Sequence, residues 1–124
     1  MAKPGIGECR FIMEKRRVVS TGLGALTPIG NNINEFWKNA VAGTSGAAPL
    51  TKFDTSNFKT KFACELKEFD AKEHLDRSDI KCTDLFSQYA LVTTGEALRD
   101  SGLDLASIDP YDIGVIWGSG QGGM

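Results

Sequence analysis

"RRVVSTGLGALTPIGNN", residues 16–32, predicts a strand that ends in a glycine turn and leads into a helix. Residues 18–21 are short and β-branched and are closed by Gly22, which is typical of a buried strand. Asn32, followed by Glu35, resembles the capping box of a helix start. Apolar residues then recur at helical spacing, namely Ile33, Phe36, Trp37, Ala40 and Val41.

A long connecting segment and a short strand are expected next. Gly43 is the predicted stop of the first helix. Residues 44–60 mix turn-forming residues with isolated aromatic residues, which predicts a connection pinned by Phe53 and Phe58. Residues 62–67 alternate between apolar and other side chains and are flanked by lysines, which predicts a half-buried strand at a sheet edge.

The second half of the chain predicts a long helix and a second buried strand. The helix should run from near Thr83 to Arg99 and end at Gly102. Asp104 can cap a single turn, and residues 113–117 form a continuous apolar run that ends in "GSGQGG". The order strand, helix, edge strand, helix, strand predicts an α/β layered domain with helices covering the sheet.

Composition limits the function classes. The chain has 124 residues, 41% of them apolar, which suits one compact domain. Its 14 basic and 16 acidic residues give a net charge of −2 without a long block of either sign, so we expect neither nucleic-acid nor membrane binding. Apolar runs stay below the roughly 18 residues of a membrane span, and residues 1–12 lack the apolar centre that is typical of a secretory signal. We therefore expect a cytoplasmic protein.

The N-terminus and the cysteines have simple interpretations. Residues 1–12, "MAKPGIGECRFI", lack periodicity, so we interpret them as an unstructured upstream extension, either a vector remnant or sequence before a misplaced start codon. The domain is expected to begin at Met13. Cys9, Cys64 and Cys82 are odd in number and scattered, which predicts reduced thiols and no metal site.

Neither glycine-rich turn fits a nucleotide-binding motif. After Gly22 and Gly24, the third glycine of the dinucleotide fingerprint is replaced by Thr27. The later "GSGQGG" turn fits only if Gly123 is the third glycine, and no phosphate-binding lysine follows either turn. A dinucleotide-binding oxidoreductase is therefore disfavoured, and tight turning with close backbone packing is favoured.

The remaining nucleophile and base candidates favour structural roles. His74 lies in the polar segment "AKEHLDR", which predicts an exposed histidine. Cys82 at a helix start has a mechanism for thiol activation, but Asp79 and Asp84 would oppose it.

Five blocks of the sequence resemble one enzyme family. They are "RRVVSTGLGALTPIGNN", "FWKNAVAGTSGAAP", "FDTSNFKTKFACELKEFD", "ALRDSGLD" and "IGVIWGSGQGG". In this order they closely resemble the N-terminal part of the β-ketoacyl-acyl-carrier-protein synthase II family, over residues 13–124. Several independent blocks make this resemblance more specific than a single glycine motif.

The resemblance implies a thiolase-like α/β/α/β/α fold, of which residues 13–124 would be the N-terminal portion, and a homodimer that elongates acyl chains in fatty-acid synthesis. In this family an acyl group passes from acyl carrier protein to a cysteine thiolate. Decarboxylation of malonyl-carrier protein then gives the carbanion that attacks the thioester. The chemistry uses an activated cysteine, an oxyanion hole and two histidines, with no metal or organic cofactor.

The resemblance also implies which positions carry function. The family's nucleophilic cysteine and both histidines lie beyond residue 124, so no catalytic residue is assigned and the chain alone is expected to be inactive. Gln121 stands at a usually apolar position that gates the acyl pocket, where a buried amide without partners costs about 1–3 kcal/mol. Arg77 and Lys81 lie in the segment that docks the acidic carrier protein, although this chain has fewer basic residues there than the family.

These departures keep a second interpretation open. The chain would then be a non-catalytic, truncated relative that only dimerises or binds carrier protein. In either case we expect the chain to fold poorly alone, because residues 18–21 and 113–117 would lack the neighbouring strands of a five-stranded layer.

Overall fold

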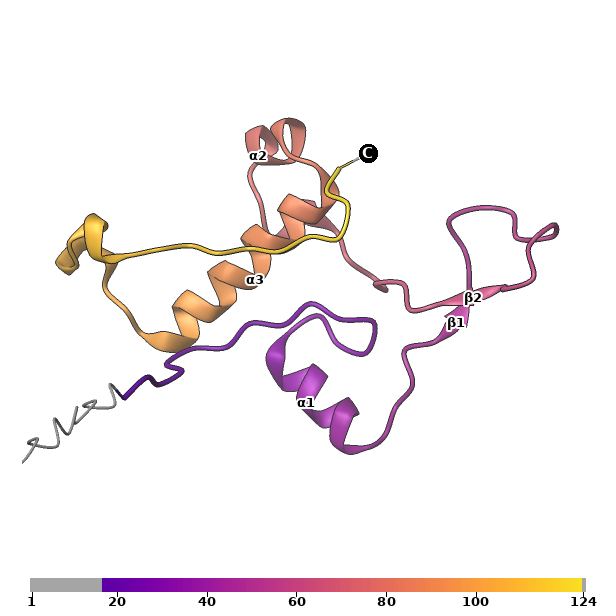
Figure 1. Cartoon of the computed structure of the whole chain (residues 1–124), viewed down its shortest axis with the longest axis horizontal. Coiled ribbons are helices and arrows are strands. Elements are labelled where there is room, and N and C mark those ends of the chain that lie inside the picture. The colour runs from indigo at the N-terminus through magenta and orange to yellow at the C-terminus, as the bar shows by residue number, and fades with distance from the viewer. Residues whose placement is uncertain (1–16, 124) are drawn as a thin grey trace, which may run out of the picture.

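The computed structural model describes residues 17–123, so the prediction for residues 1–12 lies outside the described part. Within residues 17–123 there are three α-helices, three single turns of 3-10 helix and one two-stranded sheet (Figure 1). The helices are α1 (Ile33–Val41), α2 (Arg77–Cys82) and α3 (Leu85–Ser101).

Helix α1 begins at the predicted cap. The Asn32 side chain accepts a hydrogen bond from the Glu35 N–H at 2.9 Å. The Glu35 carboxylate accepts from the N–H of Asn31, at 3.1 Å, rather than from that of Asn32, so the capping box is shifted by one residue. The helix ends just before Gly43, whose φ of +70° is one that glycine adopts without strain.

Helix α3 confirms the long helix predicted from Thr83 to Arg99. It ends as predicted at Gly102, which has a φ of +65° and donates its N–H to the Arg99 carbonyl. Helix α2 comes just before it and was not predicted as a separate helix.

Three single turns each begin with an aspartate whose carboxylate accepts a hydrogen bond from a nearby N–H. They are η1 (Ala71–Glu73) after Asp70, η2 (Leu105–Ser107) after Asp104 and η3 (Pro110–Asp112) after Asp109. The turn after Asp104 is the one that the sequence predicted.

The sheet is a short hairpin that projects from the helices (Figure 1). Strands β1 (Ala48–Pro49) and β2 (Phe62–Ala63) pair antiparallel, with Ala48 opposite Ala63. We call residues 48–63 the arm. At its tip the rings of Phe53 and Phe58 meet edge to face, with centroids 5.6 Å apart. Both side chains are more than half exposed, so the predicted pinning is limited to the contact between these two rings.

The predicted alternation on β2 is only partly correct. A half-buried strand should cover its apolar face, but Phe62 is 63% exposed, and Cys64, two residues later, is exposed as well. The half-buried side chains nearby are those of Ala63, Glu65 and Leu66. The reason is that β2 pairs with two residues only, so no second layer covers the face that carries Phe62.

The prediction that residues 18–21 and 113–117 form buried strands is wrong for the described structure. Residues 18–21 and 113–117 are extended, but neither pairs with another strand. Val18 is 92% exposed and Ile116 is 98% exposed. A strand needs a partner for its backbone groups, and residues 17–123 supply none here.

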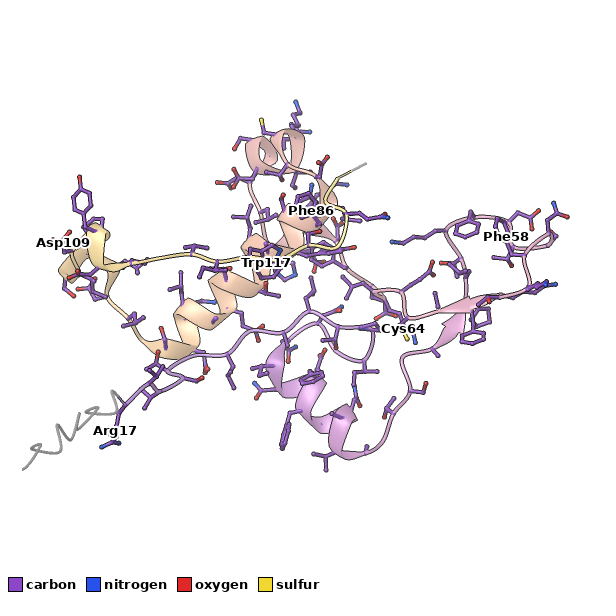
Figure 2. The ribbon with its side chains drawn as sticks, viewed as in Figure 1. Arg17, Phe58, Cys64, Phe86, Asp109 and Trp117 are labelled. Atoms are coloured by element: carbon purple, nitrogen blue, oxygen red, sulfur yellow. The ribbon has the colours of Figure 1, made fainter. Side chains whose placement is uncertain are left out.

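The described residues do not enclose an apolar core. No hydrophobic side chain among them is buried, and Gln88, at 8% exposure, is the one buried residue. What organises residues 17–123 is contact with α3, along which residues 21–27 and the segment carrying Trp117 both lie (Figures 1 and 2).

Candidate functional site

Residues 22–30, which we call the glycine loop, lie against α3 with their first residues. A Cβ atom at Gly22 would overlap the carbonyl oxygen of Ala97, and one at Gly24 would overlap that of Thr93. Thr93 and Ala97 are about one helical turn apart, so they lie on one face of α3. Only glycine lets the loop backbone approach this face so closely.

Two carboxylates of α3 hold this part of the chain by its backbone. Asp100 Oδ2 accepts a hydrogen bond from the Leu23 N–H at 2.8 Å. Glu96 Oε2 accepts from the Ala25 N–H at 2.9 Å, and Glu96 Oε1 accepts from the N–H of Ile33, the first residue of α1, at 2.8 Å. Helix α3 therefore positions both the glycine loop and α1.

A shallow groove of about 570 Å³ opens between the glycine loop and α3. Its lining is mainly apolar and includes Thr21, Leu26, Ala97, Leu98, Leu103 and Trp117. Trp117 belongs to the extended segment that follows η3 and is seen over α3 in Figure 2. The groove thus lies between the two segments that the sequence predicts as strands.

Residues 118–123, which we call the C-terminal glycine loop, carry Gln121. The Gly122 N–H donates to Ser119 Oγ at 3.0 Å, and Gly122 has a φ of +70°. A Cβ at Gly123 would collide with the carboxylate of Asp84, so this loop ends at the start of α3. Gln121 itself is exposed, and its amide faces solvent here rather than an apolar pocket.

Helix α2 carries the two basic candidates, Arg77 and Lys81. They are four residues apart, which places them on one side of the helix, and both are exposed. The buried Gln88 of α3 attaches α2, because its Nε2 donates to the carbonyls of Ile80, at 3.2 Å, and Thr83, at 3.0 Å. The structure therefore brings Arg77 and Lys81 together at the end of α3 where the C-terminal glycine loop also arrives (Figure 1).

The remaining nucleophile and base candidates are scattered. Cys64 and Cys82 are free and exposed, and Cys9 lies outside the described residues. His74 is exposed, as predicted, and its ring stacks on that of Phe69 with centroids 5.9 Å apart. In the described part of the chain, no three His, Cys, Asp or Glu side chains come together as metal ligands. No helix described here is long and apolar enough to cross a membrane.

The pKa shifts lie away from the predicted site residues. Burial raises the pKa of Tyr89, whose ring packs edge to face against Phe69. The hydroxyl of Thr51 lowers the pKa of Glu65, and the hydroxyl of Ser56 lowers that of Asp54. Glu65 and Asp54 belong to the arm and its base, so these shifts indicate local hydrogen bonding and not an acid–base pair.

Residues 15–124 match the family described as "Beta-ketoacyl synthase, N-terminal domain". The chain belongs to this family.

Individual relatives agree with the β-ketoacyl synthase assignment. The chain is 46% identical over 112 residues to the protein named 3-oxoacyl-[acyl-carrier-protein] synthase 2 of Coxiella burnetii, and 45% identical over 112 residues to that of Vibrio cholerae. Each alignment covers 90% of this chain and 27% of the relative. The chain therefore spans about a quarter of the length of these relatives.

A solved structure supports the fold class. The structure titled "The ishigamide ketosynthase/chain length factor" matches 75% of this chain and 23% of its own chain, with a TM-score of 0.68 and 34% identity. The predicted class, a partial thiolase-like α/β fold, is confirmed by this match.

Sequence reasoning missed Gln88 and Glu96. Both lie on the apolar side of the predicted helix, since Gln88 follows Leu85 by one turn and Glu96 follows Val92 by one turn. Polar side chains at such positions need hydrogen-bond partners when they are covered, and that was the available signal. Asp100 gave no comparable signal, because a charged residue near a helix end is ordinary.

Proposed function

We propose that this chain is the N-terminal portion of a 3-oxoacyl-acyl-carrier-protein synthase of type II. The parent enzyme would elongate acyl chains by decarboxylative condensation of an acyl thioester with malonyl-carrier protein in fatty-acid biosynthesis. The observation that carries this proposal is the 46% identity with a protein of that name over 90% of the chain. Under this proposal residues 13–124 belong to the synthase domain, and residues 1–12 precede it.

The reacting groups of the parent would lie outside this chain. Decarboxylative condensation needs a cysteine thiolate as acyl carrier, hydrogen-bond donors for the oxyanion and histidines that stabilise the enolate. Cys9, Cys64, Cys82 and His74 do not correspond to those groups in the family resemblance. We therefore assign no catalytic residue to this chain and propose that the chain alone does not catalyse the reaction.

The contribution of this chain would be to bind partners and shape the acyl pocket. Arg77 and Lys81 are exposed together on α2, where they would attract an acidic carrier protein and raise its association rate. The C-terminal glycine loop with Gln121 ends beside Asp84, at the same end of α3, which supports a gate close to the docking residues. The parent would act as a cytoplasmic homodimer without metal or organic cofactor.

A chimera tests the proposal directly. Residues 13–124 would replace the matching region of the Coxiella burnetii relative, and condensation of acyl-carrier protein with malonyl-carrier protein would be measured. We expect a folded chimera with turnover well above that of the same chimera without its nucleophilic cysteine. A folded chimera without turnover would favour the alternative, a non-catalytic relative that only dimerises or binds carrier protein.

Charge reversal in the same chimera tests the docking residues. Arg77→Glu with Lys81→Glu should raise KM for carrier protein several-fold and leave kcat unchanged, because exposed charges act mainly on association. Lys38→Glu, on the exposed side of α1, is the matched control and should leave KM unchanged. Equal effects of the control and the α2 variants would refute a docking role.

A further inference from the structure

We infer that Glu96 is a clasp that couples the seating of the glycine loop on α3 to the start of helix α1. One carboxylate serves two segments: Oε2 accepts from the Ala25 N–H at 2.9 Å and Oε1 accepts from the Ile33 N–H at 2.8 Å. The clasp lies outside the residues proposed to bind carrier protein, and the inference does not depend on the proposed function.

On the α1 side, the clasp supplies an acceptor that the helix lacks. Ile33 is the first residue of α1, and its N–H has no acceptor within the helix. The local cap, Asn32, is already used by the Glu35 N–H. Glu96 therefore provides the second acceptor, and its negative charge is favourable at the positive end of the helix dipole.

On the side of the glycine loop, steric contact sets the distance between the Ala25 N–H and Glu96. Gly24 lies so close to the Thr93 carbonyl that no Cβ would fit, and this contact brings the Ala25 N–H within reach of Glu96, one turn along α3. Glu96 is half-buried, so water competes less for its oxygens than it would at an exposed site. The Glu96 carboxylate can therefore accept from both N–H groups only when the glycine loop is packed on α3 and α1 begins at Ile33.

Asp100 provides an internal contrast. Its Oδ2 accepts from the Leu23 N–H at 2.8 Å, and this is a bond to the glycine loop alone. Loss of Asp100 should therefore loosen the start of the loop and leave α1 in place. Loss of Glu96 should loosen the loop and the start of α1 together.

Amide hydrogen exchange of the full 124-residue chain, followed by NMR, tests the clasp, because it measures local opening and does not require cooperative unfolding of the whole chain. In Glu96→Ala the amides of Ala25 and Ile33 should both exchange at least about tenfold faster, the effect expected when a hydrogen bond to a charged group is lost. In Asp100→Ala, which removes the acceptor of the Leu23 N–H, only the Leu23 amide should accelerate. Glu96→Gln keeps a single acceptor oxygen, so only one of the two bonds can form, and coupling predicts that the amide which keeps its acceptor also exchanges faster than in the unsubstituted chain.

Each other result would overturn the inference. Acceleration of one amide only, in either Glu96→Ala or Glu96→Gln, would show that the two contacts are independent. Equal acceleration of amides in the middle of α3, such as those of Ala90 and Leu91, would show general loss of structure. Absence of protection at both amides in the unsubstituted chain would show that the clasp does not form. Acceleration at Ile33 in Asp100→Ala would show that the coupling is not specific to Glu96.

Discussion

The two glycine-rich loops of this chain look alike in sequence, but their surroundings differ. In the glycine loop, side chains at Gly22 and Gly24 would overlap backbone oxygens of α3. In the C-terminal glycine loop, a Cβ at Gly118 or Gly120 would meet no atom within 4 Å among the described residues. The first pair of glycines is explained by close packing within the chain, whereas the second pair has no explanation in residues 17–123.

The segments that precede the two loops, residues 18–21 and 113–117, resemble each other more than the loops themselves do. Both were predicted as buried strands, and both are extended and exposed. The first continues into a loop that α3 holds by carboxylates and close contact, while the second touches α3 mainly near Trp117 and Gly123. Extended conformation alone is therefore a poor guide to whether a segment is held in place.

The largest expected effect concerns the thermal unfolding of the whole chain. Because no hydrophobic side chain among residues 17–123 is buried, contact with α3 should not give cooperative unfolding of the isolated chain. A thermal scan by circular dichroism should show a broad, sloping change, and a dye that binds exposed apolar surface should fluoresce before heating. A sharp transition of a monomer without dye binding would contradict this expectation and would require burial that the described residues do not show.

Alanine substitutions at the two pairs of glycines test the comparison itself. Gly22→Ala and Gly24→Ala should each reduce the local opening free energy by about 1–3 kcal/mol, because the new Cβ overlaps the backbone of α3. Gly118→Ala and Gly120→Ala are the matched controls and should change it by less than about 0.5 kcal/mol. Hydrogen exchange at Leu23 and Ala25 measures the effect. Similar values for the two pairs would remove the distinction between the loops.

The same contrast applies to two glutamines. Gln88 is buried and bonds to the carbonyls of Ile80 and Thr83, whereas Gln121 is exposed in the C-terminal glycine loop. Gln88→Ala should destabilise the contact between α2 and α3 by about 1–3 kcal/mol, because it leaves two carbonyls without their partner.

Gln121→Ala is the control for that substitution and should leave the α2 contact unchanged. The readout is proteolytic cleavage within α2, which should accelerate in Gln88→Ala only. Equal cleavage of the two variants would mean that α2 is held by something other than Gln88.

The sequence predicted those features of the structure that are caused by residues only a few positions away. Asn32, Gly43, Gly102 and Asp104 each act on backbone groups within a few residues, so the boundaries of α1 and α3 and the turn after Asp104 could be predicted. Glu96 could not be assigned in the same way, because its partners are far away in sequence and depend on how the glycine loop packs.

The burial predicted for residues 18–21 and 113–117 fails for a related reason. β-Branched and apolar residues indicate a strand that fits a sheet, but they do not supply the neighbouring strand. The partner has to come from elsewhere in a fold. The candidate site follows the same rule. The family resemblance of their segment pointed to Arg77 and Lys81, while their position beside the C-terminal glycine loop depends on Gln88 and α3.

The smallest effect on local stability is expected in the arm. A carboxylate also accepts a hydrogen bond from a backbone N–H there, so the arm extends the comparison to a third region. Glu65 Oε2 accepts hydrogen bonds from the hydroxyl of Thr51 at 2.8 Å and from its N–H at 3.1 Å, which joins the two sides of the arm. These bonds, that of the hydroxyl first, hold the pKa of Glu65 below its ordinary value of 4.5. A lowered folded-state pKa means that the ionised carboxylate stabilises the arm above the ordinary pKa, and that this contribution is lost as the pH falls through the folded value.

The Thr51 amide signal should therefore stay constant from neutral pH down to about pH 5 and shift at more acidic pH, where its protection relative to the intrinsic exchange rate should fall. Thr51→Val removes the hydroxyl and should move the midpoint of the Glu65 titration back towards 4.5, while Thr60→Val, elsewhere in the arm, should not. A midpoint at or above 4.5 in the unsubstituted chain would show that Glu65 does not hold the arm in solution. A lowered midpoint would place this contact beside those of Glu96 and Asp100, as a third case in which a carboxylate, and not an apolar core, fixes the path of the chain.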